Sequence, residues 1–107
     1  MNLFIALDKK KIKGIFNETS NKCIKKNDCY ILPYKHNNPI LNKSETLYIF
    51  FQYIDNDYKN LKIFDDIDDA ITFRDKNFNY GHIVGMKKDK YYDHILNCEY
   101  FSVKELN

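Results

Sequence analysis

A chain of 107 residues has the usual length of one domain, and a hydrophobic fraction of 44% with nine Tyr and eight Phe excludes a disordered protein. Three cysteines without a C-x-x-C pair exclude a disulfide-rich secreted scaffold and favour free thiols in a reducing compartment. The net charge of +2 is divided unevenly: residues 1–44 carry nine lysines against three acidic residues, and residues 45–75 carry eight acidic against three basic residues.

Residue usage limits what the lysines mean. Lysine outnumbers arginine by 16 to 1, and Asn and Ile each occur 13 times. Lys, Asn and Ile are all encoded by A/T-rich codons. We infer an A/T-rich genome, such as that of a phage, a bacterium or a parasite. Part of the lysine content therefore reflects codon usage, and its number alone does not predict nucleic-acid binding.

The N-terminal part predicts a β-hairpin and a weak helix. Residues 3–7 (LFIAL) form a short apolar run typical of a buried strand, the DKKK sequence predicts a turn, and residues 12–16 (IKGIF) return as the second arm. Residues 17–28 have weak helical character, with Asn17 as the expected N-cap.

Three further strands and a loop are expected in the middle of the chain. Residues 29–34 (CYILPY) predict a strand that Pro33 ends or places at a sheet edge, and the polar residues 35–45 predict a surface loop. Residues 47–54 (LYIFFQYI) are the most hydrophobic segment and predict a central strand. Residues 58–64 alternate as a half-buried strand does.

Four aspartates occupy five positions in IFDDIDDAITFRDK, residues 63–76. Asp65 or Asp66 is expected to cap a helix, and Asp68 or Asp69 then lies in the first turn, where the helix dipole favours negative charge. A calcium loop over residues 55–66 is disfavoured, because Lys59 stands at a ligand position and the glycine of the sharp turn is missing.

The C-terminal part is ambiguous. Residues 80–86 (YGHIVGM) predict a strand that begins at Gly81. The spacing of Tyr91, Ile95 and Cys98 predicts a helix capped by Asp89, and residues 100–103 (YFSV) equally predict a last strand.

The expected fold class is α+β, with one antiparallel sheet of about five or six strands and one or two helices packed on one face. We expect one globular domain over residues 1–107. Residues 13–24 and 61–72 share Ile-Phe followed by Asn/Asp-rich positions, which raises the alternative of two pseudo-duplicated ββαβ halves, 1–34 and 46–86, joined by the loop 35–45.

Catalytic signatures are absent from the sequence. It contains no nucleophile elbow, Walker loop, HExxH motif or glycine-rich phosphate cradle, and it has only three glycines. We therefore predict no enzyme activity, no catalytic residues, no metal site and no cofactor. The N-terminal apolar run of five residues predicts no membrane span, and the expected location is the cytoplasm, or a host cytoplasm if the gene belongs to a phage.

An acidic and tyrosine-rich surface is the leading candidate for partner binding. Closely spaced carboxylates could imitate nucleic-acid phosphates and attract a basic groove on a partner. Exposed tyrosines are enriched among residues that dominate the energetics of protein interfaces. The candidate residues are Asp55, Asp57, Asp65, Asp66, Asp68, Asp69 and Asp75, with Tyr58, Tyr80, Tyr91 and Tyr92.

Direct nucleic-acid binding is the alternative. Lysines neutralise phosphates, and nearby aromatic rings stack on bases. The candidate residues are Lys9, Lys10, Lys11, Lys13, Lys25 and Lys26.

The predicted function is that of a small non-enzymatic protein-binding module whose partner is another protein, such as a nucleic-acid-binding host complex. Small, motif-free, A/T-coded single domains are typical of phage-encoded or mobile-element inhibitors of host defence nucleases, including anti-CRISPR proteins. This expectation rests on analogy of profile.

Overall fold

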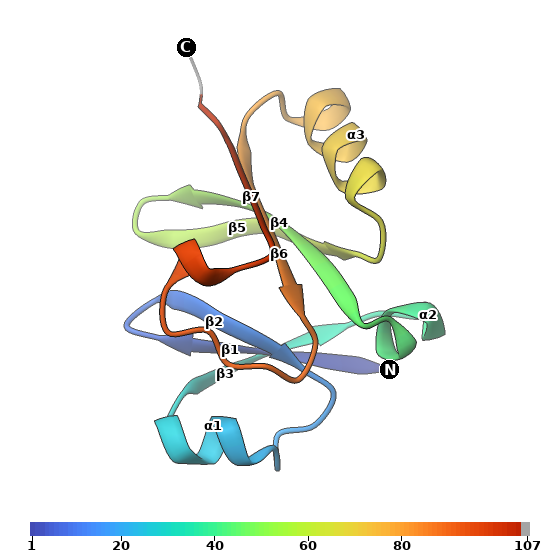
Figure 1. Cartoon of the computed structure of the whole chain (residues 1–107). Helices are drawn as coiled ribbons and strands as arrows, with labels where there is room; N and C mark the ends of the chain where they lie inside the picture. The colour runs from blue at the N-terminus through green and yellow to red at the C-terminus, as the bar shows by residue number, and fades with distance from the viewer. Residues whose placement is uncertain (106–107) are drawn as a thin grey trace.

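Seven strands form two antiparallel sheets that pack face to face in the computed structural model, which describes residues 1–105 (Figure 1). The three-stranded sheet has the order β2-β1-β3, with β1 (Asn2–Asp8), β2 (Lys11–Phe16) and β3 (Tyr30–Lys35). The four-stranded sheet has the order β5-β4-β6-β7, with β4 (Thr46–Ile54), β5 (Asp57–Phe64), β6 (Gly81–Lys87) and β7 (Tyr100–Lys104).

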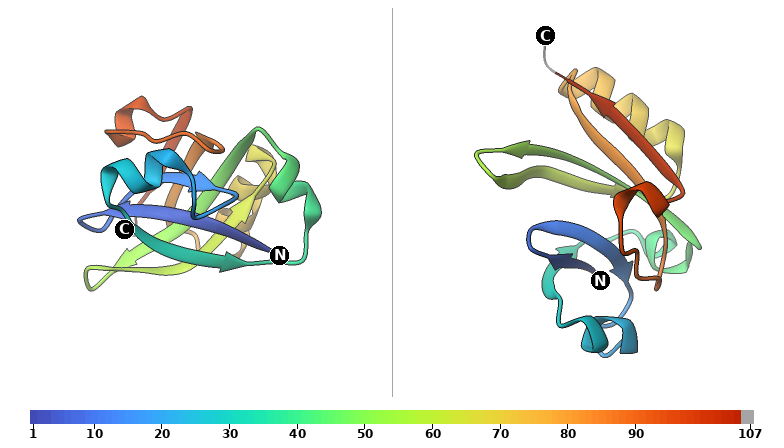
Figure 2. Two further views of the ribbon diagram at one scale, coloured as in Figure 1. Left: turned by 90° about the horizontal axis from the view of Figure 1, so that it is seen from below. Right: turned by 60° about the vertical axis from the view of Figure 1, so that its left-hand side comes forward.

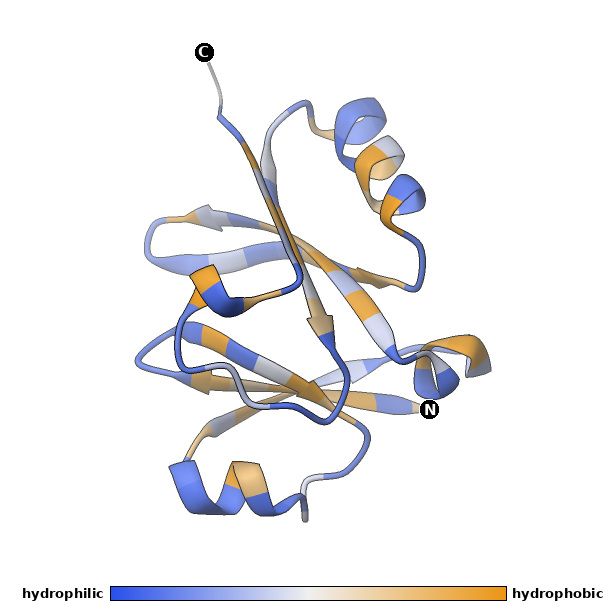
Figure 3. Ribbon diagram, in the orientation of Figure 1, coloured by the Kyte–Doolittle hydropathy of each residue, from blue (hydrophilic) through white to orange (hydrophobic). Residues whose placement is uncertain are grey.

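The main core lies between the two sheets. Because successive side chains of a strand point to opposite faces, alternate residues of each central strand reach the neighbouring sheet. Apolar segments run along the strands of both sheets in Figure 3. The inner faces are lined by Leu3, Ile5 and Leu7 of β1, Leu47, Ile49 and Phe51 of β4, and Val84 and Met86 of β6.

The helices cover the outer faces of the two sheets, so the molecule has a helix, two sheets and a second helix in succession (Figure 1). Helix α1 (Lys22–Asn27) buries Ile24 against Ala6 and Phe16 of the three-stranded sheet. Helix α3 (Ile67–Asn77) buries Ala70 against the outer face of the four-stranded sheet. The short helix α2 (Pro39–Lys43) lies in the connection between the sheets.

The α+β class is confirmed, and its predicted details are corrected. The seven strands divide between two sheets instead of one, and the helices lie on opposite sides of the molecule instead of on one face. The physical reason is that each half brings its own apolar inner face, which the other half covers. The predicted domain covers 1–107, of which residues 106–107 lie outside the described part.

The two halves have the same topology. Each consists of a hairpin, a helix and a third strand that pairs with the first strand of the hairpin, giving the orders β2-β1-β3 and β5-β4-β6. The pairs Ile5–Ile15 and Ile49–Ile63 occupy equivalent places, and each hairpin has a register shift beyond them. The expected halves 1–34 and 46–86 thus share one strand order, and β7 is an addition to the second.

Helix α1 begins later than predicted. Asn21 caps it, because its side chain accepts a hydrogen bond from the backbone N–H of Cys23 at 2.9 Å. The predicted cap, Asn17, instead donates its backbone N–H to the Asp89 carboxylate at 3.0 Å. The predicted loop 35–45 contains α2, which Asn38 caps by accepting from the N–H of Ile40 at 3.1 Å.

The predicted helix over residues 91–98 is wrong, and the alternative strand at 100–103 is confirmed as β7. The backbone N–H groups of Asp89 and Tyr92 donate to the carbonyls of Ile15 and Lys13 at 2.7 Å each. These bonds hold the segment extended along the outer edge of β2, and only a short 3₁₀ turn follows, at Ile95–Asn97. Tertiary hydrogen bonding therefore overrides the helical spacing.

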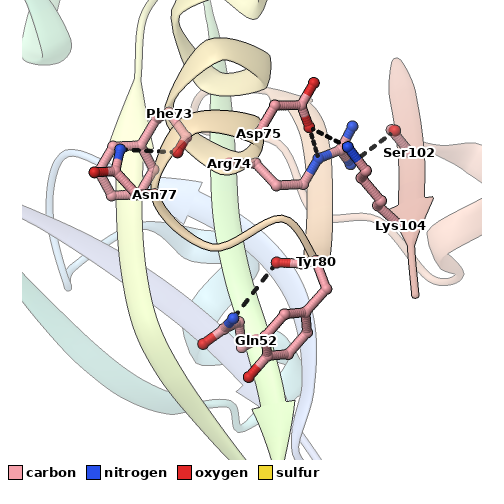
Figure 4. Close-up of polar contacts among 8 residues, drawn as sticks. All are labelled: Gln52, Phe73, Arg74, Asp75, Asn77, Tyr80, Ser102 and Lys104. Carbon is pink, nitrogen blue, oxygen red and sulfur yellow. Dashed lines mark hydrogen bonds and ion pairs between the residues drawn. The ribbon is translucent and has the colours of Figure 1, made fainter. Parts of the chain in front are cut away.

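The aspartates at the start of α3 behave as predicted. Asp66 is the N-cap, and its carboxylate accepts from the N–H of Asp68 at 2.7 Å. Near the other end of the helix, the buried Arg74 donates to Ser102 of β7 at 3.0 Å and to the neighbouring Asp75 at 3.2 Å (Figure 4). A polar contact at each end thus fixes the helix, one within its first turn and one to the sheet.

Replacing the cap, Asp66→Ala, is expected to lower the free energy of unfolding by about 1 kcal/mol, because the N–H of Asp68 loses its acceptor. Asp66→Asn keeps an acceptor and should lose much less. Asp65→Ala is the matched control, since Asp65 is also exposed and the same charge is removed. Urea unfolding followed by circular dichroism measures all three, and equal losses for Asp65→Ala and Asp66→Ala would contradict the capping role.

Candidate functional site

The structure separates the predicted acidic residues into three places. Asp55 and Asp57 lie at the turn of the β4–β5 hairpin. The cluster Asp65, Asp66, Asp68 and Asp69 lies at the start of α3, beyond the opposite end of β5, which separates the two groups by about 25 Å at 3.3 Å per residue. Asp75 is engaged with Arg74 and with Lys104, and the Lys104 ammonium lowers the pKa of its carboxyl.

The predicted tyrosines are engaged mainly in packing and hydrogen bonds within the protein. Tyr92 is only 2% exposed, and its hydroxyl accepts from the N–H of Lys87 at 2.8 Å. Tyr91 packs on the cluster beneath α1, and Tyr80 is half-buried. Tyr58 donates its hydroxyl to the carbonyl of Lys10. Tyr58 also lies beside three hollows of the surface.

The predicted lysines fall into two groups. Lys9, Lys10, Lys11 and Lys13 gather at the β1–β2 hairpin, which we call the lysine hairpin, and Lys25 and Lys26 lie on α1. Lys9 and Lys10 form the two-residue turn and have φ angles of 50° and 65°. The equivalent turn of the second hairpin holds Asp55 and Asn56 in the same left-handed region, with φ angles of 53° and 62°.

Five rings form a continuous row across the inner face of the four-stranded sheet, near the same end of the molecule. The ring centroids of Tyr53 and Tyr58 are 5.2 Å apart, and those of Tyr58 and Phe51 are 5.0 Å apart. His82 stacks on Phe51 at 5.1 Å with only 5° between the planes, and Phe101 follows at 6.2 Å. We call these residues the aromatic row; they come from β4, β5, β6 and β7.

The row reaches solvent because the four-stranded sheet is wider than the sheet that covers it. Strand β7 pairs Phe101 with Val84 and Val103 with His82, so these side chains point to the inner face. No strand of the described three-stranded sheet corresponds to β7. Phe101 and Val103 therefore remain 41% and 43% exposed, and Tyr53 at the other end of the row is 45% exposed.

The lysine hairpin and the aromatic row face each other at what we call the open end, where both hairpins project in the same direction (Figure 2). A hollow of about 350 Å³ lies between Lys9, Lys10 and Lys11 on one side and Tyr53, His82 and Phe101 on the other. Two adjoining hollows of about 310 Å³ each share Tyr58 with it. Their linings include four lysines and two acidic residues, Asp57 and Asp93.

Three hydrogen bonds join the two sides of the open end. Tyr58 donates to the carbonyl of Lys10, and the Lys10 ammonium donates to the carbonyl of Asn56 at 3.4 Å. The Lys13 ammonium donates to the carbonyl of Asp93. Lys9 and Lys11 make no such contact within residues 1–105, so their ammonium groups are available to a ligand.

Burial changes the protonation of two rings in the row. It raises the pKa of Tyr58 to about 12, with the neighbouring Tyr53 adding to the effect. It lowers the pKa of His82, whose Nδ1 has no hydrogen-bond partner within the described residues. Both rings are therefore uncharged at neutral pH, and the positive charge of the open end comes from its lysines.

The three cysteine side chains are partly buried. Burial raises the pKa of the Cys29 and Cys98 thiols, which disfavours the nucleophilic thiolate at neutral pH. Within residues 1–105, His, Cys, Asp and Glu side chains form no cluster of three or more that could hold a metal ion. In the same part of the chain, no helix combines the length and the apolar character that crossing a membrane requires.

Comparison with known proteins gives no family: no family model, no curated protein sequence and no solved structure matches the chain.

Sequence reasoning missed Tyr53, His82 and Phe101. Alternation along β4 places Tyr53 on the same face as Phe51, and this spacing can be seen in the sequence. The pairing of Phe51 with His82 and of Tyr53 with Tyr58 depends on strand register, however, and distant parts of the sequence do not reveal that register.

Tyr58→Phe is expected to lower the free energy of unfolding by about 1 kcal/mol at neutral pH, because the carbonyl of Lys10 loses its donor. Tyr53→Phe is the matched control, since its hydroxyl makes no hydrogen bond within the described residues. Denaturant unfolding of both variants measures the difference.

The same pair of variants has a predicted pH dependence. The pKa of Tyr58 rises from 10.0 to about 12 in the folded protein, so its stabilising effect is complete below pH 10 and is lost as the pH rises towards 12. The wild type should lose stability across this window more steeply than Tyr58→Phe. Parallel curves for the two proteins would contradict the assignment.

Proposed function

We propose that this chain is a non-enzymatic binding module whose open end binds nucleic acid. The observation that carries the proposal is that the fold places the lysine hairpin opposite the aromatic row across one hollow. Lysines supply the charge that phosphates need, and aromatic rings supply stacking surfaces. The proposal develops the alternative that the sequence raised for Lys9, Lys10, Lys11 and Lys13.

The turn of the lysine hairpin supports this proposal. Lysine is unfavourable in the left-handed region, which suits Asn, Asp and Gly, yet both residues of the turn are lysines. The turn of the second hairpin has Asp55 and Asn56 at its two left-handed positions. Because Asn also has A/T-rich codons, codon usage does not explain the choice of lysine. Unfavourable backbone geometry is commonly retained where side chains have a function.

The cytoplasm is the proposed location. The three cysteines are free in the structure, as expected of a reducing compartment. A phage or mobile-element origin remains part of the proposal, on the basis of residue usage alone.

Changing the turn to Lys9→Asn with Lys10→Gly is expected to separate stability from binding. The new residues suit a type I′ turn, so the free energy of unfolding should rise by about 1 kcal/mol. Affinity for an RNA or DNA oligonucleotide should fall, and the slope of log K against log salt should shrink by about 0.7 for each lysine removed. Fluorescence anisotropy at several salt concentrations measures both quantities.

The matched control is Lys25→Gln with Lys26→Gln, which removes the same charge from exposed positions of α1. It should leave the affinity nearly unchanged. Equal losses for the two double variants would show that only the total charge matters and would contradict an interface at the open end.

A protein partner bound through the acidic cluster Asp65, Asp66, Asp68 and Asp69 is the second candidate. All four carboxylates are exposed, and none forms an ion pair with another described residue. Their negative charge is therefore not neutralised by a described cation and could meet a basic groove on a partner, as an inhibitor of a host nuclease complex would.

Replacing these four residues with Asn should abolish capture of a stoichiometric protein from a nuclease-treated host lysate, if the second candidate is right. The wild type is captured in parallel, and mass spectrometry identifies the protein. A lower melting temperature with capture unchanged would leave helix capping as the only role of the cluster.

A further inference from the structure

We infer that the nucleic acid bound at the open end is a single strand, with bases stacked on Tyr53 and Phe101. This inference rests on the proposed function and specifies its ligand. The two rings stand at the ends of the aromatic row and are 45% and 41% exposed, whereas Phe51 between them is only 6% exposed. The accessible stacking surfaces of the row are therefore its two ends, with the partly exposed His82 between them.

The two accessible rings rest against partly buried rings of the row. Tyr53 meets Tyr58 at an interplanar angle of 66°, and Tyr58 meets Phe51 at 77°, both edge-to-face arrangements. Phe101 rests against His82, which is stacked on Phe51. Rings fixed in this way lose little conformational freedom when a base stacks on them, so they are suited to be a platform.

The two walls of the hollow match the two sides of a single strand. One wall is lined by Lys9, Lys10 and Lys11, and the other is lined by aromatic rings and Ile95. An unpaired strand presents phosphates along one side and the faces of its bases along the other. A duplex keeps the faces of its bases stacked inside the helix and therefore offers the aromatic wall nothing to stack on.

The hollow has few groups that could read base edges. The Tyr58 hydroxyl is already engaged by the carbonyl of Lys10, which leaves the Tyr53 hydroxyl and the His82 imidazole as the polar groups of the aromatic wall. Stacking tolerates every base, and the edges of bases meet few donors and acceptors here. Binding is therefore expected to depend little on base sequence.

The test compares three probes with the full-length protein: a single-stranded oligonucleotide of mixed sequence, a hairpin duplex of the same nucleotide number, and inorganic polyphosphate as a competitor. The single strand should bind more tightly than the duplex by about tenfold or more. Polyphosphate should compete poorly at physiological salt, because it offers charge without bases.

Tyr53→Ala and Phe101→Ala should each weaken single-strand binding about tenfold and leave the salt slope unchanged, since no charge is removed. Tyr53→Phe should retain binding. Both rings are exposed, so these variants are expected to fold, which circular dichroism verifies.

A spectroscopic arm reports stacking directly. The chain has no tryptophan, so Tyr53→Trp introduces a single reporter, and Ile40→Trp on α2 places the control at an exposed site outside the open end. Single-stranded probe should quench the indole fluorescence of the Tyr53→Trp variant but leave that of the control unchanged. Unchanged affinity of the Tyr53→Ala variant, together with no quenching of the Tyr53→Trp variant, would contradict the stacking role.

The outcomes distinguish this inference from the function on which it rests. Equal affinity for single strand and duplex, with both alanine variants unaffected, would overturn the inference and leave binding by lysine charge. Binding of none of the probes would overturn the proposed function as well.

Discussion

Mutual burial of two apolar sheet faces is the constraint on which the rest of the structure depends. Each ββαβ half covers the outer face of its sheet with its own helix and leaves the inner face bare. Ile5 and Ile49, at the centres of their sheets, are both fully buried only because the sheets meet. Burying a side chain of this size contributes roughly 2 kcal/mol, so neither half is expected to keep its fold without the other.

The open end follows from a mismatch between the two halves. The second half has longer hairpin strands and an additional strand, β7, so its inner face extends past the sheet that covers it. Where cover is incomplete, the core ends in rings that are partly exposed, such as Phe101 and Tyr53. The lysine hairpin stands over this boundary, and a charged wall thereby faces an apolar one across a hollow.

Local signals in the sequence were sufficient for most elements. Apolar runs located the strands around Ile5 and Ile49, and the aspartates located the start of α3 at Asp65 or Asp66. The division into two sheets was not predictable, because alternation gives a strand its faces but not its neighbours. Residues 89–92 were misassigned for a related reason: their hydrogen bonds go to β2, about 75 residues earlier, and outweigh a helical spacing.

The candidate site was predictable only in part. Lysines close together in sequence stay together at a hairpin, so Lys9 to Lys13 could be grouped in advance. The aromatic row joins four strands through their register, and only the folded structure shows it. The acidic residues were grouped by sequence proximity as well, but the length of β5 separates Asp57 at its start from Asp65 just beyond its end.

The connection between the sheets has a consequence for assembly. Residues 36–45 connect the two halves along the chain. The halves otherwise meet through side chains and through the segment 88–92, which is hydrogen-bonded to β2. The chain therefore resembles a heterodimer whose subunits are joined by a short tether. Such a tether holds its partners at an effective concentration in the millimolar range. A sandwich whose halves bind each other only moderately well can therefore persist as one molecule at any dilution.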